Sequence, residues 1–295
     1  MTLSAASVTL GPVPGISAGP ALPVEALVIG KPVAMAADLL PRLFNLCRGA
    51  QAMAARLSLG LPATDDPRAE ILRDHRLKLC VMLPRAFGLD PIPLPEPTRP
   101  HQPLALPGAM DAAALLGPEG LPDMPSRLAG PLAPLFHRVA ATFPPGMATC
   151  AALPLPSAPL ADGAFENSPA GRQSHHPLLR RIEQTHGRGP LWRLAGLMAD
   201  LEAVSHNRLP APALSADGTA TVPAARGIYA LRVTQRDGVV TGLCRRTPTD
   251  HQLAPGGALL QSLANLPATH RALAPKVIAL HDPCIPVTVR EAEHA

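Results

Sequence analysis

Cysteines are the residues of this sequence best suited to bind a metal, and they occupy positions 47, 80, 150, 244 and 284. A zinc site takes a second ligand two to four residues from the first, yet no C-x-x-C pair occurs. Cys284 ends the tetrad HDPC, and Val287 stands where a second ligand would be expected. An odd number of widely spaced cysteines in 295 residues also argues against a secreted disulfide framework. We therefore expect a reduced, cytoplasmic protein, in which HDPC looks like half of a motif.

Helical periodicity predicts the elements that would carry these thiols. The stretch around Cys47 is helical from residue 34 to about 59, and Pro41 must kink this helix or start a second one. Residues 64–89 form the clearest helix, because an acidic cap and a proline in the first turn precede an apolar-leaning face. His75 lies among charged residues of this helix, so we expect it at the surface or half-buried.

Alternating apolar residues predict strands at 7–13 and 25–30. A stronger signal is Asp237-Gly238, which lies between two alternating stretches and is typical of a two-residue hairpin turn. The segment KVIAL (276–280), directly before HDPC, is expected to be extended. Together these patterns predict an α+β, mainly helical fold with a small β-hairpin element.

Composition limits the classes of function. Apolar residues make up 47% of the chain, enough for one domain over 1–295, with a proline-rich irregular excursion at 91–164. One Trp, one Tyr and five Phe offer no platform for stacking bases, and the net charge of +4 comes without a Lys/Arg run, so nucleic acid is not expected as a partner. No stretch approaches the ~18 apolar residues of a membrane span.

The C-terminal segment resembles the signature D-P-C-x-x-C-x-x-H of [NiFe]-hydrogenase large subunits. Asp282, Pro283 and Cys284 match it, whereas Val287 and Arg290 replace its second cysteine and its histidine. The segment RLFNLCRGAQ is similar to the N-terminal signature of the same family, R-x-C-G-x-C-x-x-x-H. The matching residues there are Arg42 and Cys47, and the replacements are Phe44, Asn45 and Gln51.

Intermediate motifs of that family follow in the same order along the chain. Arg226 and Gly227 fit an A-P-R-G segment, and Pro248 and Thr249 fit the start of P-S/T-x-W-N. The stretch FENSPAGR (165–172) resembles E-T-G-x-x-A-R. The tryptophan and the asparagine of the second motif are replaced by His251 and Gln252. The resemblance implies a trimmed form of the large-subunit fold.

In the family, four thiolates bind nickel, and two of them also bind an iron that carries two cyanides and one carbon monoxide. This chain keeps one cysteine per motif and cannot build the nickel site, a pattern that resembles HupK/HoxV-type hydrogenase maturation proteins. The resemblance implies a scaffold or chaperone rather than an enzyme, which holds or transfers the Fe(CN)2(CO) fragment without nickel. Its implied partners are a HypC-type chaperone, a HypD-type scaffold and the immature hydrogenase large subunit.

The same resemblance implies roles for five residues. Cys47 and Cys284 would be the metal ligands. Arg226 and Thr249 would lie beside the diatomic ligands, where a guanidinium is a good donor to cyanide nitrogens, and Asp282 would orient Arg226. Cys47 matches a position that bridges both metals, and Cys284 matches a nickel position. Hence either Cys284 turns toward iron, or Cys47 alone holds iron, or the site carries none.

Two other interpretations remain open at this point. A relative can lose its metal and keep its fold, which would leave a metal-free structural or interaction module. A minimal hydrogenase is the other, and the missing thiolates argue against it. Taken alone, a buried cysteine is more often a small apolar core residue than a ligand.

Overall fold

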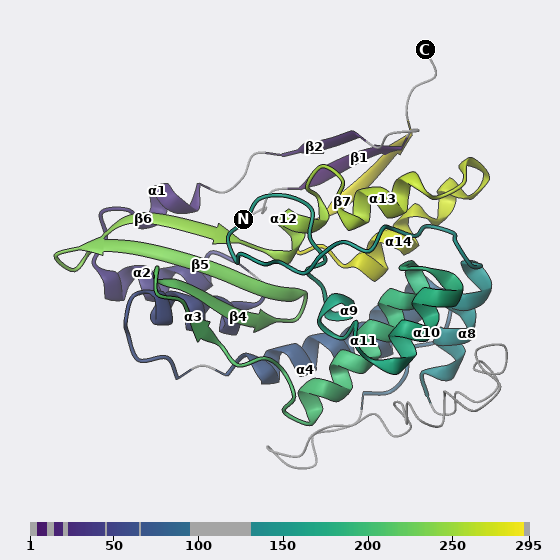
Figure 1. Ribbon diagram of the computed structural model, residues 1–295, viewed down its shortest axis with the longest axis horizontal. Coiled ribbons are helices and arrows are strands. Elements are labelled where there is room, and N and C mark those ends of the chain that lie inside the picture. The colour runs from purple at the N-terminus through teal and green to yellow at the C-terminus, as the bar shows by residue number, and fades with distance from the viewer. Residues whose placement is uncertain are drawn as a thin grey trace.

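The computed structural model describes residues 5–10, 15–19, 23–44, 46–64, 66–94 and 131–291. Helices pack beside two separate sheets (Figure 1). A four-stranded antiparallel sheet lies on the left in that view with N-terminal helices beside it, and the helices that follow fill the lower right. The fold is α+β and mainly helical, which confirms the predicted class.

The N-terminal helices pack beside the four-stranded sheet. They are α1 (Val24–Val28), α2 (Val33–Leu39), a 3-10 turn (Leu40–Arg42) and α3 (Arg48–Ser58). The strand predicted at 25–30 is wrong, because Val24 and Val28 are both buried and their spacing of four residues places them on one face of a helix. Pro41 lies in the 3-10 turn, and α3 begins only after it. This interruption places Cys47 at a helix N-terminus rather than inside a helix.

One long helical segment carries residues for both the core and the site. It consists of α4 (Pro67–Leu77), a π-helical turn (Lys78–Met82) and α5 (Leu83–Ala86). Asp66 caps it by accepting a hydrogen bond from the backbone N–H of Arg68 at 3.0 Å. The surface or half-buried position expected for His75 is wrong. The side chain is fully buried, because Asp200 of a distant helix lies 2.7 Å from its Nε2 and satisfies it there.

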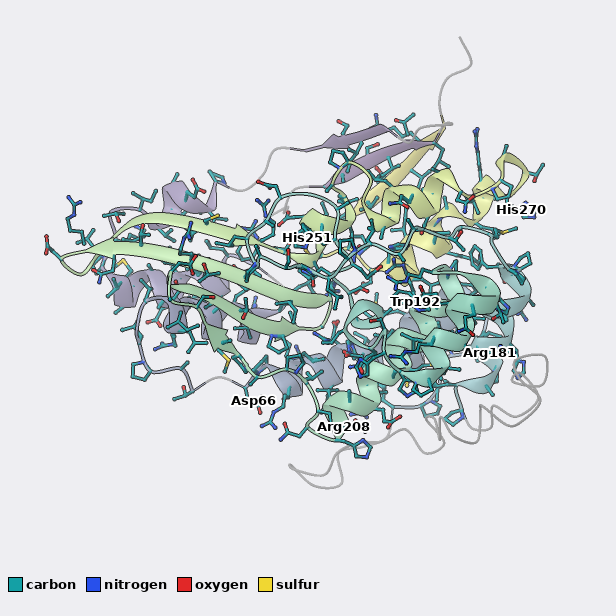
Figure 2. The ribbon with its side chains drawn as sticks, viewed as in Figure 1. Asp66, Arg181, Trp192, Arg208, His251 and His270 are labelled. Atoms are coloured by element: carbon teal, nitrogen blue, oxygen red, sulfur yellow. The ribbon has the colours of Figure 1, made fainter. Side chains whose placement is uncertain are left out.

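The larger core surrounds α11 (Pro190–Ser205), which is buried on almost every side. The other helices of this part are α8 (Ala133–Thr142), α9 (Pro169–Arg172) and α10 (Pro177–His186). Trp192 of α11 is fully buried among them (Figure 2). Gly196 lets α9 cross α11 closely, because a Cβ at this position would collide with Ala170. Within the predicted irregular excursion, residues 95–130 lie outside the described residues, and α8 is the helix that the rest contains.

The predicted hairpin is present and belongs to a larger sheet. Its strands, in spatial order, are β3 (Ala213–Leu214), β4 (Thr219–Ala224), β5 (Gly227–Arg236) and β6 (Val239–Arg246). Asp237 and Gly238 have φ angles of 51° and 74°, and this left-handed pair gives the tight turn that matches the twist of antiparallel strands. One face of the sheet packs on α3 and encloses a second apolar core.

The C-terminal segment returns to the N-terminus. It contains α12 (Pro248–Gln252), α13 (Ala258–Ala264), a 3-10 turn (Ala268–Leu273), α14 (Ala274–His281) and β7 (Val287–Glu291). The extended conformation predicted for 276–280 is wrong, because Ala274, Val277 and His281 form one buried helical face. Strand β7 pairs in parallel with β1 (Ala6–Leu10), and β1 pairs with β2 (Gly15–Ala18). Within the described ranges, no helix has the length and apolar character needed to cross a membrane.

Candidate functional site

The two retained cysteines meet at one cavity of about 550 Å³. Cys47 and Cys284 both contribute to its wall, together with Arg226 and Thr249. Cys47 packs against both apolar cores, so the cavity lies where the sheet and the helical body meet. Asp282 is not part of the wall but lies behind Arg226. The structure therefore brings all five sequence-predicted residues to one place, while their roles toward a metal stay predictions.

Cys47 is held at the N-terminus of α3 in a left-handed conformation, with φ of 54°. Its side chain does not cap the helix. Instead, Glu70 of α4 accepts hydrogen bonds from the backbone N–H groups of Arg48 and Gly49, at 2.8 and 3.0 Å. Because a carboxylate from another helix satisfies these donors, the thiol is free to face the cavity. Burial raises the pKa of this thiol to about 11, and the nearby guanidinium of Arg226 opposes the rise.

Cys284 follows the end of α14, where Asp282 adopts a left-handed conformation with φ of 50° and turns the chain toward the cavity. The backbone N–H of Cys284 donates to Thr249 Oγ1 at 2.7 Å. Thr249 is itself fixed, because Thr247 and Asp250 form a reciprocal capping box at the start of α12. Burial raises the pKa of the Cys284 thiol, while a hydrogen bond with Thr249 and the charge of Arg226 act in the opposite direction.

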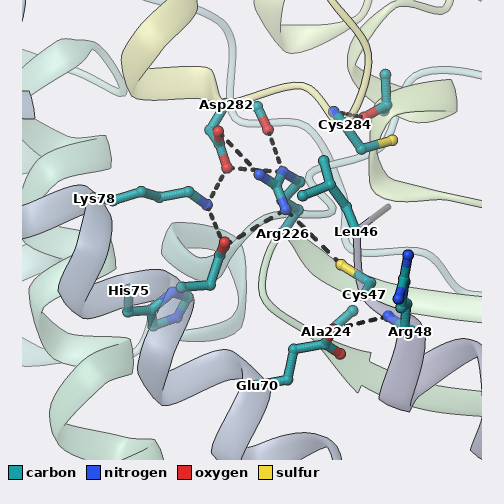
Figure 3. Close-up of polar contacts among 12 residues, drawn as sticks. Leu46, Cys47, Arg48, Glu70, His75, Lys78, Ala224, Arg226, Asp282 and Cys284 are labelled. Carbon is teal, nitrogen blue, oxygen red and sulfur yellow. Dashed lines mark hydrogen bonds and ion pairs between the residues drawn. The ribbon is translucent and has the colours of Figure 1, made fainter. Parts of the chain in front are cut away.

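Arg226 is the centre of a buried network of charges (Figure 3). Its Nε lies 2.9 Å from Asp282 Oδ2, and its Nη1 lies 3.5 Å from Asp74 Oδ2. Nη1 also lies 3.9 Å from the sulfur of Cys47. Lys78 completes the network by contacting both carboxylates. The contact expected between Asp282 and Arg226 is thus present, and it aims the guanidinium at a thiol.

Sequence reasoning missed Asp74 and Lys78. Their i, i+4 spacing is visible in the sequence, but it is usually the mark of an exposed helical ion pair. Here the Lys78 side chain is only 5% exposed. It lies where α4 passes into a π-helical turn, a local change of helical register that the sequence pattern does not reveal. Burial opposes the charge of Asp74, but Lys78 and Arg226 outweigh it and lower the pKa of this carboxyl.

The positions at which this chain replaces a cysteine or a histidine of the two motifs separate into two groups. Phe44 and Gln51 of the N-terminal motif still line the cavity. Val287 and Arg290 of the C-terminal motif lie in β7, in register with Ala6 and Thr9 of β1. Among the described residues no group of three or more His, Cys, Asp or Glu side chains could hold a metal ion. Of the replaced positions, those of the N-terminal motif thus lie in the cavity wall and those of the C-terminal motif in a strand.

The remaining motif residues support the walls of the cavity. Glu166 and Arg172 of the FENSPAGR segment form buried ion pairs with Arg193 and Asp200, both on α11. Of the replaced residues, His251 lies against Asn167 and Ala161 (Figure 2), and Gln252 donates to the carbonyl of His281 at 3.1 Å. These contacts tie α9, α11, α12 and α14 together behind the cavity.

No protein-family model matches the chain. The chain is 50% identical over 277 residues to the hydrogenase expression/formation protein HupK of Rhodobacter capsulatus, an alignment that covers 93% of this chain and 92% of that protein.

Solved structures show the same fold at low sequence identity. A chain of the reduced [NiFeSe] hydrogenase from Desulfovibrio vulgaris Hildenborough matches with a TM-score of 0.50 and 13% identity, over 92% of this chain and 93% of the other. An oxygen-pressurised variant of that enzyme matches with a TM-score of 0.51 and 14% identity, over 95% and 98%. These likenesses concern the fold alone, whereas the 50% identity to a curated relative extends along nearly the whole chain. The chain therefore belongs to the HupK family of hydrogenase expression/formation proteins, which is built on the fold of the hydrogenase large subunit.

Proposed function

We propose that the protein is a scaffold that holds and passes on the Fe(CN)2(CO) fragment during assembly of a [NiFe]-hydrogenase large subunit. The observation that carries the proposal is the convergence of Cys47, Cys284 and Arg226 on one cavity. Two thiolates and three diatomic ligands give iron five ligands, which leaves one position open. In the resemblance, the thiolates that bind iron also bind nickel, whereas here the fragment would be held without a second metal, as a carrier requires.

The chemistry of loading follows from the state of the two thiols. Because burial raises the pKa of both Cys47 and Cys284, each carries a proton in the empty protein. Each iron–sulfur bond forms as a thiol releases its proton to solvent, so loading liberates two protons. The thiolate-bound fragment is an anion, and the guanidinium of Arg226, 3.9 Å from the Cys47 sulfur, is placed to donate a hydrogen bond to it.

The same geometry bears on the two alternative functions. A minimal hydrogenase would need four thiolates for nickel, and the two missing positions are Phe44 and Val287, of which Val287 lies in strand β7. A metal-free interaction module would fit the burial that raises the pKa of both thiols, because burial disfavours the thiolate that binds a metal. Against this alternative, both thiols contribute to the wall of a cavity. The proposed partners are a HypC-type chaperone, a HypD-type scaffold and the immature large subunit, and we do not expect nucleic acid or nickel to bind.

Infrared spectroscopy of protein produced anaerobically together with the maturation machinery tests the proposal. Cyanide and carbonyl stretching bands are expected in wild type and should disappear in Cys47→Ala and in Cys284→Ala. Cys244→Ala is the matched control, because this half-buried thiol lies on β6 outside the cavity wall and its loss should leave the bands unchanged. Wild-type protein without these bands, and with iron content near zero, would refute the scaffold in favour of the metal-free module.

A further inference from the structure

Three arginines line the cavity, namely Arg226, Arg245 and Arg246, and their surroundings differ. Arg226 is paired with the carboxylates of Asp74 and Asp282. Arg245 of β6 forms no ion pair with any residue that the structure describes, whereas its neighbour Arg246 pairs with Asp162. An arginine in a cavity wall without a carboxylate partner is an unused positive charge, and it favours an anionic ligand.

Arg245 is nevertheless held in place by its apolar and polar neighbours. Its guanidinium lies over the ring of Phe44, 4.8 Å from the ring centroid. The guanidinium also forms a hydrogen bond with the hydroxyl of Tyr229, a residue that is only 4% exposed. Burial raises the pKa of this phenol to about 12, and the charge and hydrogen bond of Arg245 oppose the rise. The phenol thus keeps its proton, and an oxygen that accepts from Arg245 can still donate toward the cavity.

Phe44 connects this arrangement to the family motif. Phe44 occupies a place where the resemblance has a cysteine, and its ring now carries a guanidinium instead. The change replaces a negative metal ligand by a support for a positive hydrogen-bond donor. Arg245 and Cys284 line the same cavity, so the charge of Arg245 is available to a ligand held there.

We propose that Arg245 and Tyr229 form a second anion-binding arm of the cavity, which donates hydrogen bonds to a cyanide ligand of the bound iron fragment. Phe44 acts as a positioning residue by fixing the plane of the guanidinium. The assignment to cyanide rests on the proposed scaffold function, whereas the anion site itself does not. Arg226 and Arg245 would then both donate to the fragment. The charge of Arg226 is already balanced by Asp74 and Asp282, whereas the charge of Arg245 would be balanced by the anion.

Thiocyanate tests the anion site without iron, because its C≡N stretch shifts when a donor binds it. Titration of the empty wild-type protein, followed by infrared spectroscopy, should show a bound band. Arg245→Gln should weaken binding by about tenfold or more, the loss expected for a charge-assisted hydrogen bond. Arg245→Lys should retain part of the affinity, and Phe44→Leu should weaken binding with the charge intact. Arg236→Gln, an exposed arginine of the same hairpin, is the matched control and should bind like wild type.

Iron-loaded protein tests the assignment to cyanide. The cyanide bands of the Arg245→Gln variant should shift relative to wild type, while those of Arg236→Gln should not. Absence of thiocyanate binding in wild type, or equal binding by Arg245→Gln, would overturn the anion site. Unchanged cyanide bands in loaded Arg245→Gln would overturn the assignment to cyanide. If wild type carries no iron bands at all, the scaffold proposal fails while the thiocyanate titration still decides the anion site.

Discussion

Asp74 and His75 are adjacent on α4, yet they belong to two polar clusters with different environments. His75 lies in the larger core against Asp200, and both side chains are fully buried. Asp200 also accepts hydrogen bonds from Arg172 at 2.8 Å and from Gln173 at 2.8 Å. This closed cluster joins α4, α9 and α11, and none of these residues lines the cavity between the two cysteines.

Asp74 turns instead toward Lys78 and Arg226, which connect it to Asp282 and the cavity. The side chains of Asp74 and Asp282 remain 19% and 20% exposed, and Arg226 reaches a thiol. Two positive and two negative groups leave this open cluster without net charge. The comparison teaches that adjacent polar residues can serve stability on one side of a helix and ligand handling on the other.

The closed cluster should dominate stability. Replacing Arg172 by Ala leaves the Asp200 carboxylate buried without its main counter-charge, so we expect the free energy of unfolding to fall by about 3–5 kcal/mol. Urea denaturation followed by circular dichroism measures it. Arg180→Ala, an exposed arginine on α10, is the control and should change little. A loss as small as that of the control would show that Asp200 is satisfied without Arg172.

The open cluster should be less costly to disturb. In Lys78→Met, the carboxylates of Asp74 and Asp282 are left to Arg226 alone. Because both remain partly exposed, we expect a loss of about 2 kcal/mol in the free energy of unfolding. The same urea titration measures it. A loss equal to or larger than that of Arg172→Ala would remove the distinction between the two clusters.

For iron binding we expect the reverse order, with the open cluster more important than the closed cluster. Arg226→Lys keeps the charge but loses the planar fork that contacts Asp282 and Cys47 together. We expect stability to fall by only about 1 kcal/mol, while the iron content and the cyanide bands of loaded protein drop well below wild type. Full iron occupancy in this variant would show that the guanidinium geometry is not needed to hold the fragment.

Local signals in the sequence predicted the elements that depend on local chemistry. Asp237-Gly238 predicted the hairpin because two left-handed residues are needed for its turn, and the acidic cap predicted α4. The resemblance of the two half-motifs to one family also predicted that Cys47 and Cys284 share a site, because the family brings the two motifs together at one pocket.

Features set by tertiary contacts could not be predicted in the same way. The burial of His75 depends on Asp200, which is distant in sequence, and the pairing of β7 with β1 joins opposite ends of the chain. The segment 276–280 has an apolar run that fits a strand or a buried helix equally well. The sequence could not single out Arg245 for a related reason, because its lack of an ion pair with the described residues is visible only in three dimensions.

Two buried histidines, one in the closed cluster and one adjacent in sequence to Asp282 of the open cluster, should differ in how they make stability depend on pH. His75 has Asp200 beside it, whereas the ring of His281 has the hydroxyl of Ser262 beside its Nε2, at 3.0 Å. Burial lowers the pKa of His281 well below its ordinary value of 6.5. The folded protein therefore keeps His281 neutral, while the unfolded chain takes up a proton as the pH falls below 6.5. Stability from this group is complete above that pH and is lost progressively in acid.

Urea denaturation at pH 7.5 and pH 5.5 can isolate this contribution. Between these two values, wild type should lose about 1 kcal/mol more of its free energy of unfolding than His281→Gln, which has no titrating ring. His75→Gln should differ less from wild type in its pH dependence, because Asp200 partly supports a proton on the His75 ring. Equal acid sensitivity in wild type and His281→Gln would mean that His281 takes up its proton in the folded state. If His75→Gln reduces the loss of unfolding free energy between the two pH values more than His281→Gln does, the closed cluster, rather than the end of α14, limits stability in acid.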